Sequence, residues 1–452
     1  MYKILLLNPP AECGYVKEGR CQHKAAVFST VYPPMTLAYM ASLLRDKSDV
    51  KLLDAIGLDM SLEDVLKSII DFKPDYIICN TTTPTFKNDI VVFREIKGHH
   101  SCKIVVYGVH VTALWREALE CDFIDAVVIG EPEITVSELA EKEIRQIDGI
   151  AYKIHGKIVK NKERGFMDLD SLPIPAWDIV DLSRYRVPVT GEKYVLLTTG
   201  RGCPYNCSFC VSQSYYGLKY RKRSISKIID EILSAKKLGV ENFFLFAETF
   251  TLDKQYVSNL CDELLSRRIS IKWVCNSRVD TVDEDVLSKM KQAGCWMISF
   301  GIESSSQDIL DSCNKGIVVG QVESAVEMAN KIGLVVVGHF IFGLPGEDSK
   351  SALNTLDFSL NLPLTFAEYY IFTPFPGSLL FEQFKDKVGD DWATFEYSQN
   401  IVSTTIDLQS IRKKAYMSFY LRPKIMLKIL SVFGLKRLHS LIISGVKFVL
   451  NI

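Results

Sequence analysis

Short apolar runs alternate with amphipathic segments over most of this chain, and this alternation restricts the fold more than any other feature. Within residues 1–146 the runs are rich in Val, Ile and Leu and occupy residues 3–7, 50–54, 76–79, 103–107 and 125–129. Segments of helical period, for example 35–45 and 61–72, separate them. Strands separated by helices predict an open parallel α/β sheet of flavodoxin-like type. Ligands of such sheets bind at the carboxyl ends of the strands.

A second alternating stretch begins at Tyr194. Its strand candidates are residues 194–199, 242–246, 271–275, 296–300, 335–342 and 368–372. Helical patterns between them occupy residues 225–237, 254–267, 284–293, 319–332 and 349–361. Six β/α units predict a partial (β/α)6 barrel, which stays open where an eightfold barrel would close. Its site is expected at the carboxyl ends of the strands.

Two further segments complete the predicted organisation. Residues 147–190 are expected to form a hairpin and then a connector, in which Pro173 and Pro175 enforce extended backbone. Residues 401–452 are expected to form a basic amphipathic helical tail, because the chain from Leu408 onward has nine Lys or Arg and no Asp or Glu. The predicted units are therefore a sheet domain (1–146), a connector (147–190), a barrel (191–400) and the tail (401–452).

Composition restricts the class of function. The 452 residues include 53 Lys+Arg and 54 Asp+Glu, and a net charge of −1 argues against a dedicated nucleic-acid binder. No apolar run reaches the ~18 residues that a membrane span needs. The four apolar residues before Asn8 are too few for a signal-peptide core. We therefore expect a cytoplasmic protein that binds no nucleic acid.

Three of the twelve cysteines lie within eight residues. Cys203, Cys207 and Cys210 have the spacing Cys-x3-Cys-x2-Cys. Soft thiolates favour zinc or an iron–sulfur centre, but structural zinc usually takes four ligands, and the chain has no second Cys-x2-Cys pair. Three thiolates on a short loop suit a 4Fe–4S cluster with one iron open to a substrate or cofactor. A zinc site and a set of structural cysteines are the alternatives.

The cysteine loop resembles the signature of the radical S-adenosylmethionine (SAM) superfamily, and it follows the first barrel strand as in that family. The resemblance implies that the three cysteines bind the cluster and that Phe209 packs near the adenine of SAM. In that family the open iron chelates the amino and carboxylate groups of SAM. One electron then releases a 5′-deoxyadenosyl radical.

Motifs at later strand ends resemble the same family. By resemblance, Glu248 binds the SAM ammonium, and an anionic side chain suits a cationic amine. Arg278 could pair with the SAM carboxylate, and Glu303 resembles a ribose-binding acid. Gly- and Pro-containing turns at 342–347 and 373–378 end the next two strands. Each motif alone is also compatible with an ordinary solvated strand end, whereas five in register favour one site.

Segments of the first unit resemble the cobalamin-binding domain of class B radical SAM enzymes. They are Asn8-Pro9-Pro10, residues 32–39, residues 107–112 and Gly130-Glu131-Pro132-Glu133. The resemblance implies that the corrin face lies over Thr81, Thr83 and Thr85, and that the nucleotide tail is surrounded by Gly108, His110, Thr112, Gly130 and Glu131. The Asp-x-His-x-x-Gly motif that supplies an axial His elsewhere is absent, so cobalamin would lack a protein imidazole ligand. The alternative is a domain that keeps the fold without the cofactor.

The leading hypothesis is a cobalamin-dependent radical SAM methylase that acts on an unactivated carbon of a small or lipid-like metabolite. One SAM would supply the methyl group and a second the radical, so the cofactors carry the chemistry. The main alternative is a non-methylating cyclase or oxidase of a tetrapyrrole-like or other hydrophobic substrate. An RNA methylthiotransferase and a non-enzymatic iron–sulfur protein fit fewer of the motifs.

A one-electron donor of flavodoxin or ferredoxin type is the expected protein partner. For the tail, three interpretations are open: helices that close the barrel edge, a docking surface for the electron donor, or peripheral contact with an anionic membrane through residues 408–452. In the last case apolar residues would enter the lipid boundary, among them Ile425, Leu430, Phe433, Leu441, Ile442 and Phe448.

Overall fold

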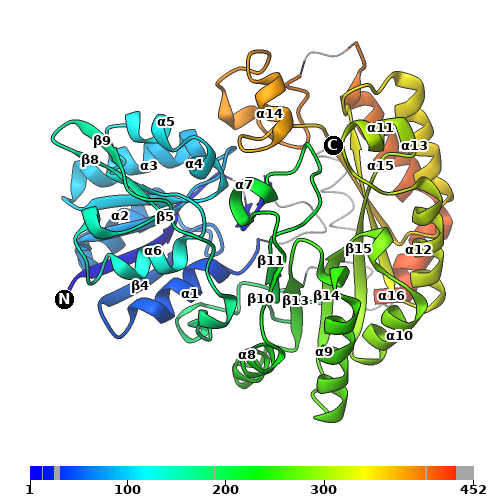
Figure 1. The fold of residues 1–452 in the computed structure, drawn as a ribbon, viewed down its shortest axis with the longest axis horizontal. Coiled ribbons are helices and arrows are strands. Elements are labelled where there is room, and N and C mark those ends of the chain that lie inside the picture. Colours follow the sequence, from blue (N-terminus) through cyan, green and yellow to red (C-terminus); the bar gives the residue numbers. More distant parts are fainter. Residues whose placement is uncertain (13, 25–30, 188–189, 403–404, 434–452) are drawn as a thin grey trace.

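Two sheets lie side by side in the computed structural model, which describes residues 1–12, 14–24, 31–187, 190–402 and 405–433 (Figure 1). The first sheet has the order β4-β1-β5-β6-β7-β8-β9. Its strands are β1 (Lys3–Asn8), β4 (Asp49–Asp54), β5 (Tyr76–Asn80), β6 (Lys103–Tyr107), β7 (Ala126–Val128), β8 (Ile150–Ile154) and β9 (Lys157–Lys160). The first five of these in chain order pair in parallel with the order 2-1-3-4-5. This order confirms the flavodoxin-like prediction.

Helices cover both faces of the first sheet. They are α1 (Met35–Leu44), α2 (Leu62–Phe72), α3 (Phe86–His99), α4 (Val109–Ala113), α5 (Trp115–Glu120) and α6 (Pro132–Glu138). Successive strand residues point to opposite faces, so Leu5 and Ile77 pack against α2, α3 and α5, whereas Ile4 and Ile78 pack against α1 and α6. Burial on both faces explains why the strands read as continuous apolar runs.

The predicted hairpin at residues 150–160 is part of the first sheet. Strand β8 pairs antiparallel with β7, and β9 pairs antiparallel with β8. The sheet therefore extends to Lys160, beyond the boundary at residue 146 that the sequence indicated. The hairpin covers the free backbone groups of β7, which would otherwise form an open edge.

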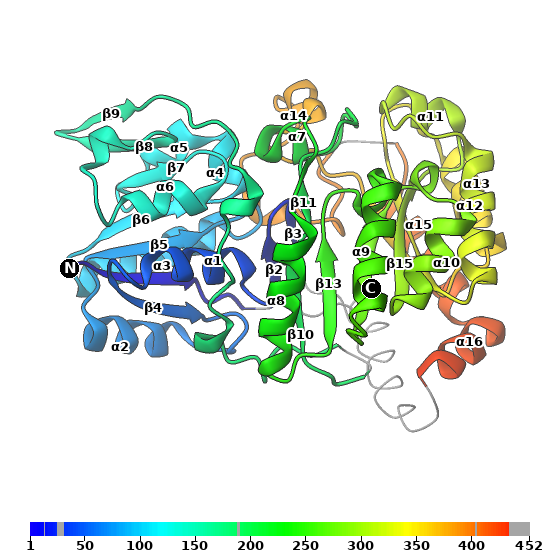
Figure 2. The same cartoon turned by 60° about the horizontal axis from the view of Figure 1, so that its bottom comes forward.

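The second sheet contains six strands that follow chain order, β10-β13-β14-β15-β16-β17, and every neighbouring pair is parallel. Its strands are β10 (Tyr194–Thr198), β13 (Asn242–Phe246), β14 (Lys272–Ser277), β15 (Cys295–Glu303), β16 (Val335–Phe342) and β17 (Phe366–Ile371). The helices on its outer side are α8 (Ile225–Lys237), α9 (Lys254–Ser266), α10 (Glu284–Gln292), α12 (Val319–Lys331) and α13 (Ser349–Asn361) (Figure 2). The predicted partial barrel of six β/α units is confirmed.

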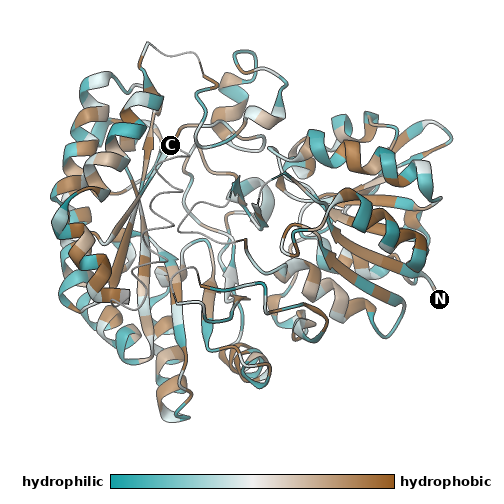
Figure 3. Cartoon of the chain, turned by 180° about the vertical axis from the view of Figure 1, so that it is seen from behind, coloured by the Kyte–Doolittle hydropathy of each residue, from teal (hydrophilic) through white to brown (hydrophobic). Residues whose placement is uncertain are grey.

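Figure 3 shows mostly hydrophobic strands flanked by helices that contain both hydrophilic and hydrophobic residues. Outward-facing strand residues such as Trp273 and Phe340 are fully buried beneath these helices.

Shorter elements complete the barrel: β11 (Gly200–Arg201), β12 (Arg221–Lys222), α7 (Ser212–Tyr216), α11 (Gln307–Ser312) and α14 (Leu379–Phe384). The 3-10 turns span Ile144–Gln146, Leu169–Ser171, Trp177–Ile179, Phe250–Leu252, Val279–Thr281 and Trp392–Thr394.

A hairpin between β1 and α1 connects the two sheets, and the sequence did not predict it. Strands β2 (Tyr15–Glu18) and β3 (Cys21–Lys24) pair antiparallel and lie between the sheets in Figure 2. On one side the Lys17 ammonium lies 3.1 Å from the Asp89 carboxylate of α3. On the other, the turn residue Gly19 (φ +56°) packs so closely on the barrel that a Cβ would lie 2.9 Å from the Tyr216 hydroxyl.

The helix α15 (Leu408–Tyr420) runs along the free edge of β17 and satisfies its backbone. Arg412 Nε donates to the Tyr369 carbonyl (2.8 Å), and the Tyr416 hydroxyl accepts from the Tyr369 N–H (3.1 Å). The Tyr420 hydroxyl accepts from the Ala367 N–H (3.2 Å) and donates to the Ala367 carbonyl (3.0 Å). Four residues of helix rise about 6 Å and two residues of strand about 6.6 Å, so the two repeats match.

The helix α16 (Pro423–Phe433) follows α15 and joins the hydrophobic core of the barrel through Ile425 and Ile429, which are buried. Its basic residues also serve the fold: the Lys428 ammonium donates to Asn330 Oδ1 (2.6 Å) and the Pro363 carbonyl (2.7 Å). Arg422 donates to the Leu360 carbonyl. The first of the three interpretations, barrel closure, therefore describes residues 408–433, although these side chains are bound and not solvated. Ile425 is buried against the barrel and is not available to lipid.

The remainder of the predicted tail, including Leu441, Ile442 and Phe448, lies outside the described residues. Across the described part of the chain, no helix is both long enough and apolar enough for a membrane span.

Candidate active site

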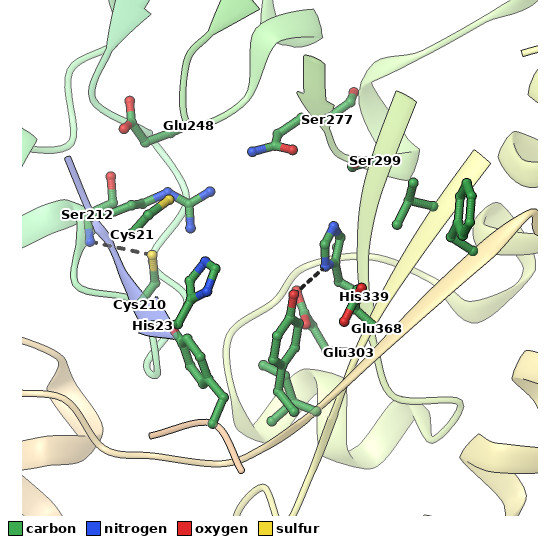
Figure 4. Close-up of a pocket in the computed structure, with 18 of the residues that line it drawn as sticks. Cys21, His23, Cys210, Ser212, Glu248, Ser277, Ser299, Glu303, His339 and Glu368 are labelled. Atoms are coloured by element: carbon green, nitrogen blue, oxygen red, sulfur yellow. Dashed lines mark hydrogen bonds between the residues drawn. The ribbon is translucent and has the colours of Figure 1, made fainter. Parts of the chain in front are cut away.

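A cavity of about 940 Å³ lies in the open interior of the barrel (Figure 4). All three clustered cysteines line it, on the loop that follows β11. The cavity also receives side chains from the carboxyl ends of the barrel strands and from the β2–β3 hairpin. Figure 4 shows Cys210 and Glu248 on one side of the space, opposite Glu303, His339 and Glu368.

Backbone contacts fix the conformation of the cysteine loop. Gly202 has φ +86°, and a Cβ at this position would lie 2.2 Å from the Lys219 carbonyl oxygen, so only glycine fits. The N–H of Cys203 donates to the Gly217 carbonyl (3.1 Å), and the N–H of Cys210 donates to the Cys207 carbonyl (3.0 Å). The loop is therefore held before any cofactor binds.

The three thiols face one cavity without converging on a point. Within the described ranges, no three His, Cys, Asp or Glu side chains are close enough to hold a single metal ion. Burial raises the pKa of Cys207 to about 11 and also raises that of Cys210. A bound metal centre supplies the positive charge that such thiols need in order to ionise. This arrangement fits a cluster, which spans the space between separated ligands, better than it fits one zinc ion.

Glu248 lines the cavity, and one oxygen of its carboxylate has no hydrogen-bond partner. One carboxylate oxygen accepts from the Gly202 N–H (3.0 Å), whereas the buried Oε1 has no hydrogen-bond partner. Burial raises the pKa of this carboxyl. A buried acceptor without a partner is costly unless a ligand completes it. The residue expected to bind the SAM ammonium therefore lines the cavity, and its contact with SAM stays a prediction.

Arg278 is held by several groups at the end of β14. Its guanidinium donates twice to Asp280 (2.9 Å each) and once to the Lys315 carbonyl (2.9 Å), and it lies 3.5 Å from the Tyr205 ring centroid. Its Nη1 lies 4.0 Å from Cys207 Sγ. Asp280 already neutralises much of the charge of Arg278. The predicted pairing with the SAM carboxylate would therefore require Arg278 to bind both carboxylates.

Glu303 lines the cavity through an irregularity in β15. The register between β15 and β16 shifts at Gly301/Glu303, and Glu303 has a positive φ of 69°. Its carboxylate lies 2.7 Å from the Lys315 ammonium, and both side chains are buried. Phe209 also lines the cavity, next to the cysteines. The predicted SAM-binding residues Phe209, Glu248, Arg278 and Glu303 are thus brought together around one space.

The predicted cobalamin residues of the first unit occupy different surroundings. Thr81 and Thr85 donate to Asp89 (2.7 and 2.8 Å), and the Thr83 N–H donates to Gln22 of the hairpin (2.9 Å). The β2–β3 hairpin therefore covers these threonines, and they do not line the cavity. Their contact with a corrin face stays a prediction. It requires that the hairpin move away from the threonines or that the hairpin and the threonines contact the corrin together.

The remaining predicted cobalamin residues are mostly engaged within the protein. Buried His110 lies 3.2 Å from Thr83 Oγ1 and packs between Phe86 and Trp392. Burial lowers the pKa of His110 to about 3. The Thr112 hydroxyl accepts from the Gly130 N–H (3.1 Å), and Gly108 immediately precedes α4.

Glu131 forms part of a buried ion network between the two units. Its carboxylate lies 3.1 Å from Arg201 of β11 and 2.9 Å from Arg221 of β12. Arg201 also pairs with Glu133, whose side chain is 0% exposed. Burial opposes ionisation, yet the two arginines hold the pKa of Glu131 below its usual value. The Gly130-Glu131-Pro132-Glu133 motif therefore ties the first unit to the cluster loop.

Several cavity residues have no sequence signal of their own. Arg20, Cys21 and His23 come from the β2–β3 hairpin, which sequence periodicity does not reveal. Lys315 follows α11, and only its pairing with Glu303 across the bulge identifies it. His339, Glu368 and Tyr370 alternate with buried residues on β16 and β17, so the inward face of those strands was the available signal.

Comparison with known proteins identifies the family. A model of the Radical SAM superfamily matches residues 197–359, and a model of the B12 binding domain matches residues 24–140. The chain is 33% identical over 442 residues to an uncharacterized methyltransferase of Pyrococcus horikoshii, an alignment that covers 94% of each protein. The chain belongs to the B12-binding radical SAM enzymes. The predicted cofactors, a 4Fe–4S cluster, SAM and cobalamin, follow from the two domains.

Two further likenesses support this assignment. The enzyme is 30% identical to the anaerobic magnesium-protoporphyrin IX monomethyl ester cyclase of Rubrivivax gelatinosus, over 79% of this chain and 67% of the relative. The solved structure of the cobalamin-dependent SAM radical enzyme OxsB, with aqua-cobalamin and SAM bound, superposes with a TM-score of 0.73 at 17% identity. That superposition covers 97% of this chain and 72% of OxsB, and it shows that the fold is shared.

Proposed function

We propose that this radical SAM enzyme transfers a methyl group to an unactivated carbon of a small or lipid-like molecule. The observation that carries the proposal is the shared cavity, which the three cysteines line together with Glu248, a residue whose buried Oε1 has no hydrogen-bond partner. The full-length similarity to a methyltransferase supports methyl transfer. When bound, the cluster supplies the electron that breaks a carbon–sulfur bond of SAM, and cobalamin supplies the methyl group.

The protein residues position and isolate the reactants in this proposal. Cys203, Cys207 and Cys210 would hold the cluster, and the Glu248 carboxylate would accept a hydrogen bond from the SAM ammonium. Glu303 would accept from a ribose hydroxyl, with the Lys315 ammonium holding its carboxylate in place. Burial of Glu248, Glu303 and Lys315 limits their contact with water, which strengthens their electrostatic contacts.

The β2–β3 hairpin is the proposed contact for cobalamin on the side of the first unit. Gly14, Arg20 and His23 line the cavity, whereas Thr81, Thr83 and Thr85 lie behind the hairpin. A corrin between the sheets would therefore meet the hairpin first. His110 packs between Phe86 and Trp392 and does not line this cavity, so it would not contact cobalamin there.

The first test is anaerobic reconstitution with iron, sulfide and hydroxocobalamin, followed by incubation with SAM and a reductant. Wild-type enzyme should release 5′-deoxyadenosine, and Cys207→Ala should abolish this release. Cys261→Ala is the control, because this buried thiol lies on α9 outside the cavity. Release by the Cys207 variant would overturn the assignment of the cluster ligands.

A second candidate function is radical ring closure or oxidation without methyl transfer, favoured by the 30% identity to the magnesium-protoporphyrin cyclase. The products separate the two candidates. A methylase forms S-adenosylhomocysteine and 5′-deoxyadenosine together, whereas a cyclase forms 5′-deoxyadenosine alone. Turnover in an extract of the native cells that yields no S-adenosylhomocysteine would favour the cyclase.

We also propose that the region of α15 and α16, in addition to closing the barrel, makes peripheral contact with an anionic membrane. The outer side of this region exposes Leu421 (61%), Met426 (53%) and Leu427 (66%), with Lys424 among them. Apolar side chains flanked by lysine suit a membrane interface, where each basic residue contributes about 1 kcal/mol.

Sedimentation with vesicles tests this contact. Binding should occur with anionic vesicles, weaken with salt and be reduced in a Met426→Ser/Leu427→Ser variant. Equal binding to neutral vesicles, or none to either kind, would leave barrel closure and docking of a flavodoxin- or ferredoxin-type donor as the roles of this region.

A further inference from the structure

Residues on the inward face of the barrel line the cavity at several levels along the strands. On β14, Val274 and Asn276 are partly exposed, whereas the alternating Trp273 and Cys275 are buried under the helices. Strand β16 repeats this pattern with partly exposed His339 and Ile341. In a closed eightfold barrel the inward side chains fill the interior in layers. Here the same layers line an elongated cavity.

The strand register orders these layers from the mouth to the floor. Gly301, His339 and Glu368 pair across β15, β16 and β17 in one layer. The next layer towards the floor contains Ser299, Val337 and Phe366, and the following one contains Phe244, Val274 and Met297. Tyr194 and Asn242, the first residues of β10 and β13, pair at the floor. All of these residues line the cavity.

Polarity changes sharply along this axis. The His339 layer is polar: His339 Nδ1 lies 2.9 Å from the Tyr370 hydroxyl, and Glu368 accepts from Tyr416 (3.0 Å). Below it, aromatic and aliphatic side chains dominate, with Ser299, Asn276 and Asn242 as the polar exceptions. The distance from the His339 layer to the floor is about six strand residues, or roughly 20 Å. The lower part of the cavity is therefore long and lined mainly by apolar side chains.

We propose that the barrel interior below His339 binds the apolar chain of an amphipathic substrate. The polar group of that substrate lies at the His339–Tyr370 pair, and the reacting carbon lies above it, towards the cysteine loop. This inference rests on the proposed function, because it names the substrate class of the same site. Burial of each methylene removes apolar surface from water, which tightens binding by about fourfold.

Displacement of the fluorescent fatty acid cis-parinaric acid from the reconstituted enzyme tests the proposal. Octanol, dodecanol and hexadecanol are the competitors, because they differ in chain length and carry no charge. Affinity should rise with chain length until the chain fills the depth of the barrel. A second measurement, SAM-dependent release of 5′-deoxyadenosine, is made on the same preparation.

Val337→Trp fills the layer below His339 and should weaken parinarate binding at least tenfold. Val274→Trp, on neighbouring β14, repeats the test in case one variant fails to fold. Val91→Trp is the matched control, because Val91 is exposed on α3, far from the barrel interior, and its binding should equal that of wild type.

Three results overturn the proposal: no saturable parinarate binding, affinity independent of chain length, or unchanged binding in both blocking variants. These failures are distinguishable from failure of the proposed function. An enzyme that cleaves SAM but binds no chain refutes only the substrate class. An enzyme that binds chains but never cleaves SAM refutes the radical chemistry.

Discussion

The buried Arg201 side chain should be the largest single electrostatic contribution to the contact between the two units. Arg201 is 3% exposed and pairs with Glu131 and with Glu133, which is fully buried. Arg221 still pairs with Glu131 when Arg201 is removed, so the uncompensated charge would lie on Glu133. Removal of one partner of a buried ion pair costs about 3–5 kcal/mol. We therefore expect Arg201→Met to lower the free energy of unfolding by about that amount.

Urea unfolding followed by circular dichroism measures this change. Arg45→Met is the control, because Arg45 pairs with Asp178 at the surface and both side chains are about half exposed. Loss of an exposed pair should cost about 0–1 kcal/mol. In the double variant Arg201→Met/Glu133→Gln the buried charge is gone, so part of the loss should be recovered. An Arg201→Met variant no less stable than Arg45→Met would refute this reasoning.

Three further predictions concern single side chains. His110 has a pKa of about 3 in the folded protein against 6.5 when unfolded; its contribution to stability is complete above pH 6.5 and is lost as the pH falls towards 3. His110→Phe should reduce this acid sensitivity in titrations followed by circular dichroism, and an identical acid transition would contradict the prediction. Glu248→Gln should weaken SAM binding about 10–100-fold, because a charge-assisted hydrogen bond worth ~1.5–3 kcal/mol is lost. Equilibrium dialysis at alkaline pH measures this affinity, and an unchanged value would mean that Glu248 does not bind SAM. Tyr420→Phe leaves the Ala367 N–H and carbonyl without their partner and should cost about 1–3 kcal/mol in urea unfolding, whereas no change would mean that water replaces the hydroxyl.

The sequence predicts the two sheets well because their strands are buried on both faces or backed by helices. Residues 103–107, 242–246 and 335–342 were expected as strands, and β6, β13 and β16 occupy those residues. Continuous apolar runs bounded by helical patterns leave little ambiguity. The β2–β3 hairpin is different, because its strands have four residues each and include Lys17 and Glu18, whose polar groups find partners far along the chain, among them Asp89 and Thr36.

The residues of the candidate site also fall into two groups, those that the sequence predicts and those that it does not. Cys203, Cys207 and Cys210 are local in sequence, so their spacing alone predicts their common role. Arg278 and Glu303 were placed at the cavity from their strand ends, but their partners Asp280 and Lys315 were not expected. Charge pairs between loops depend on tertiary contacts, which residue spacing in the sequence does not predict. The same holds for Arg422 and Lys428, which bind backbone carbonyls and not solvent.

The order of synthesis gives α15 a role before the enzyme is complete. Until Arg412, Tyr416 and Tyr420 are available, the Tyr369 and Ala367 backbone groups of β17 have no partner along that edge. Roughly 50 residues separate the end of β17 from the end of α15, which corresponds to about 3–10 s of translation at ~5–20 residues per second. For that interval the nascent barrel carries an open strand edge of the kind that recruits other chains. Ribosome-bound chains that end before residue 408 should therefore depend on chaperones more than chains that end after residue 433.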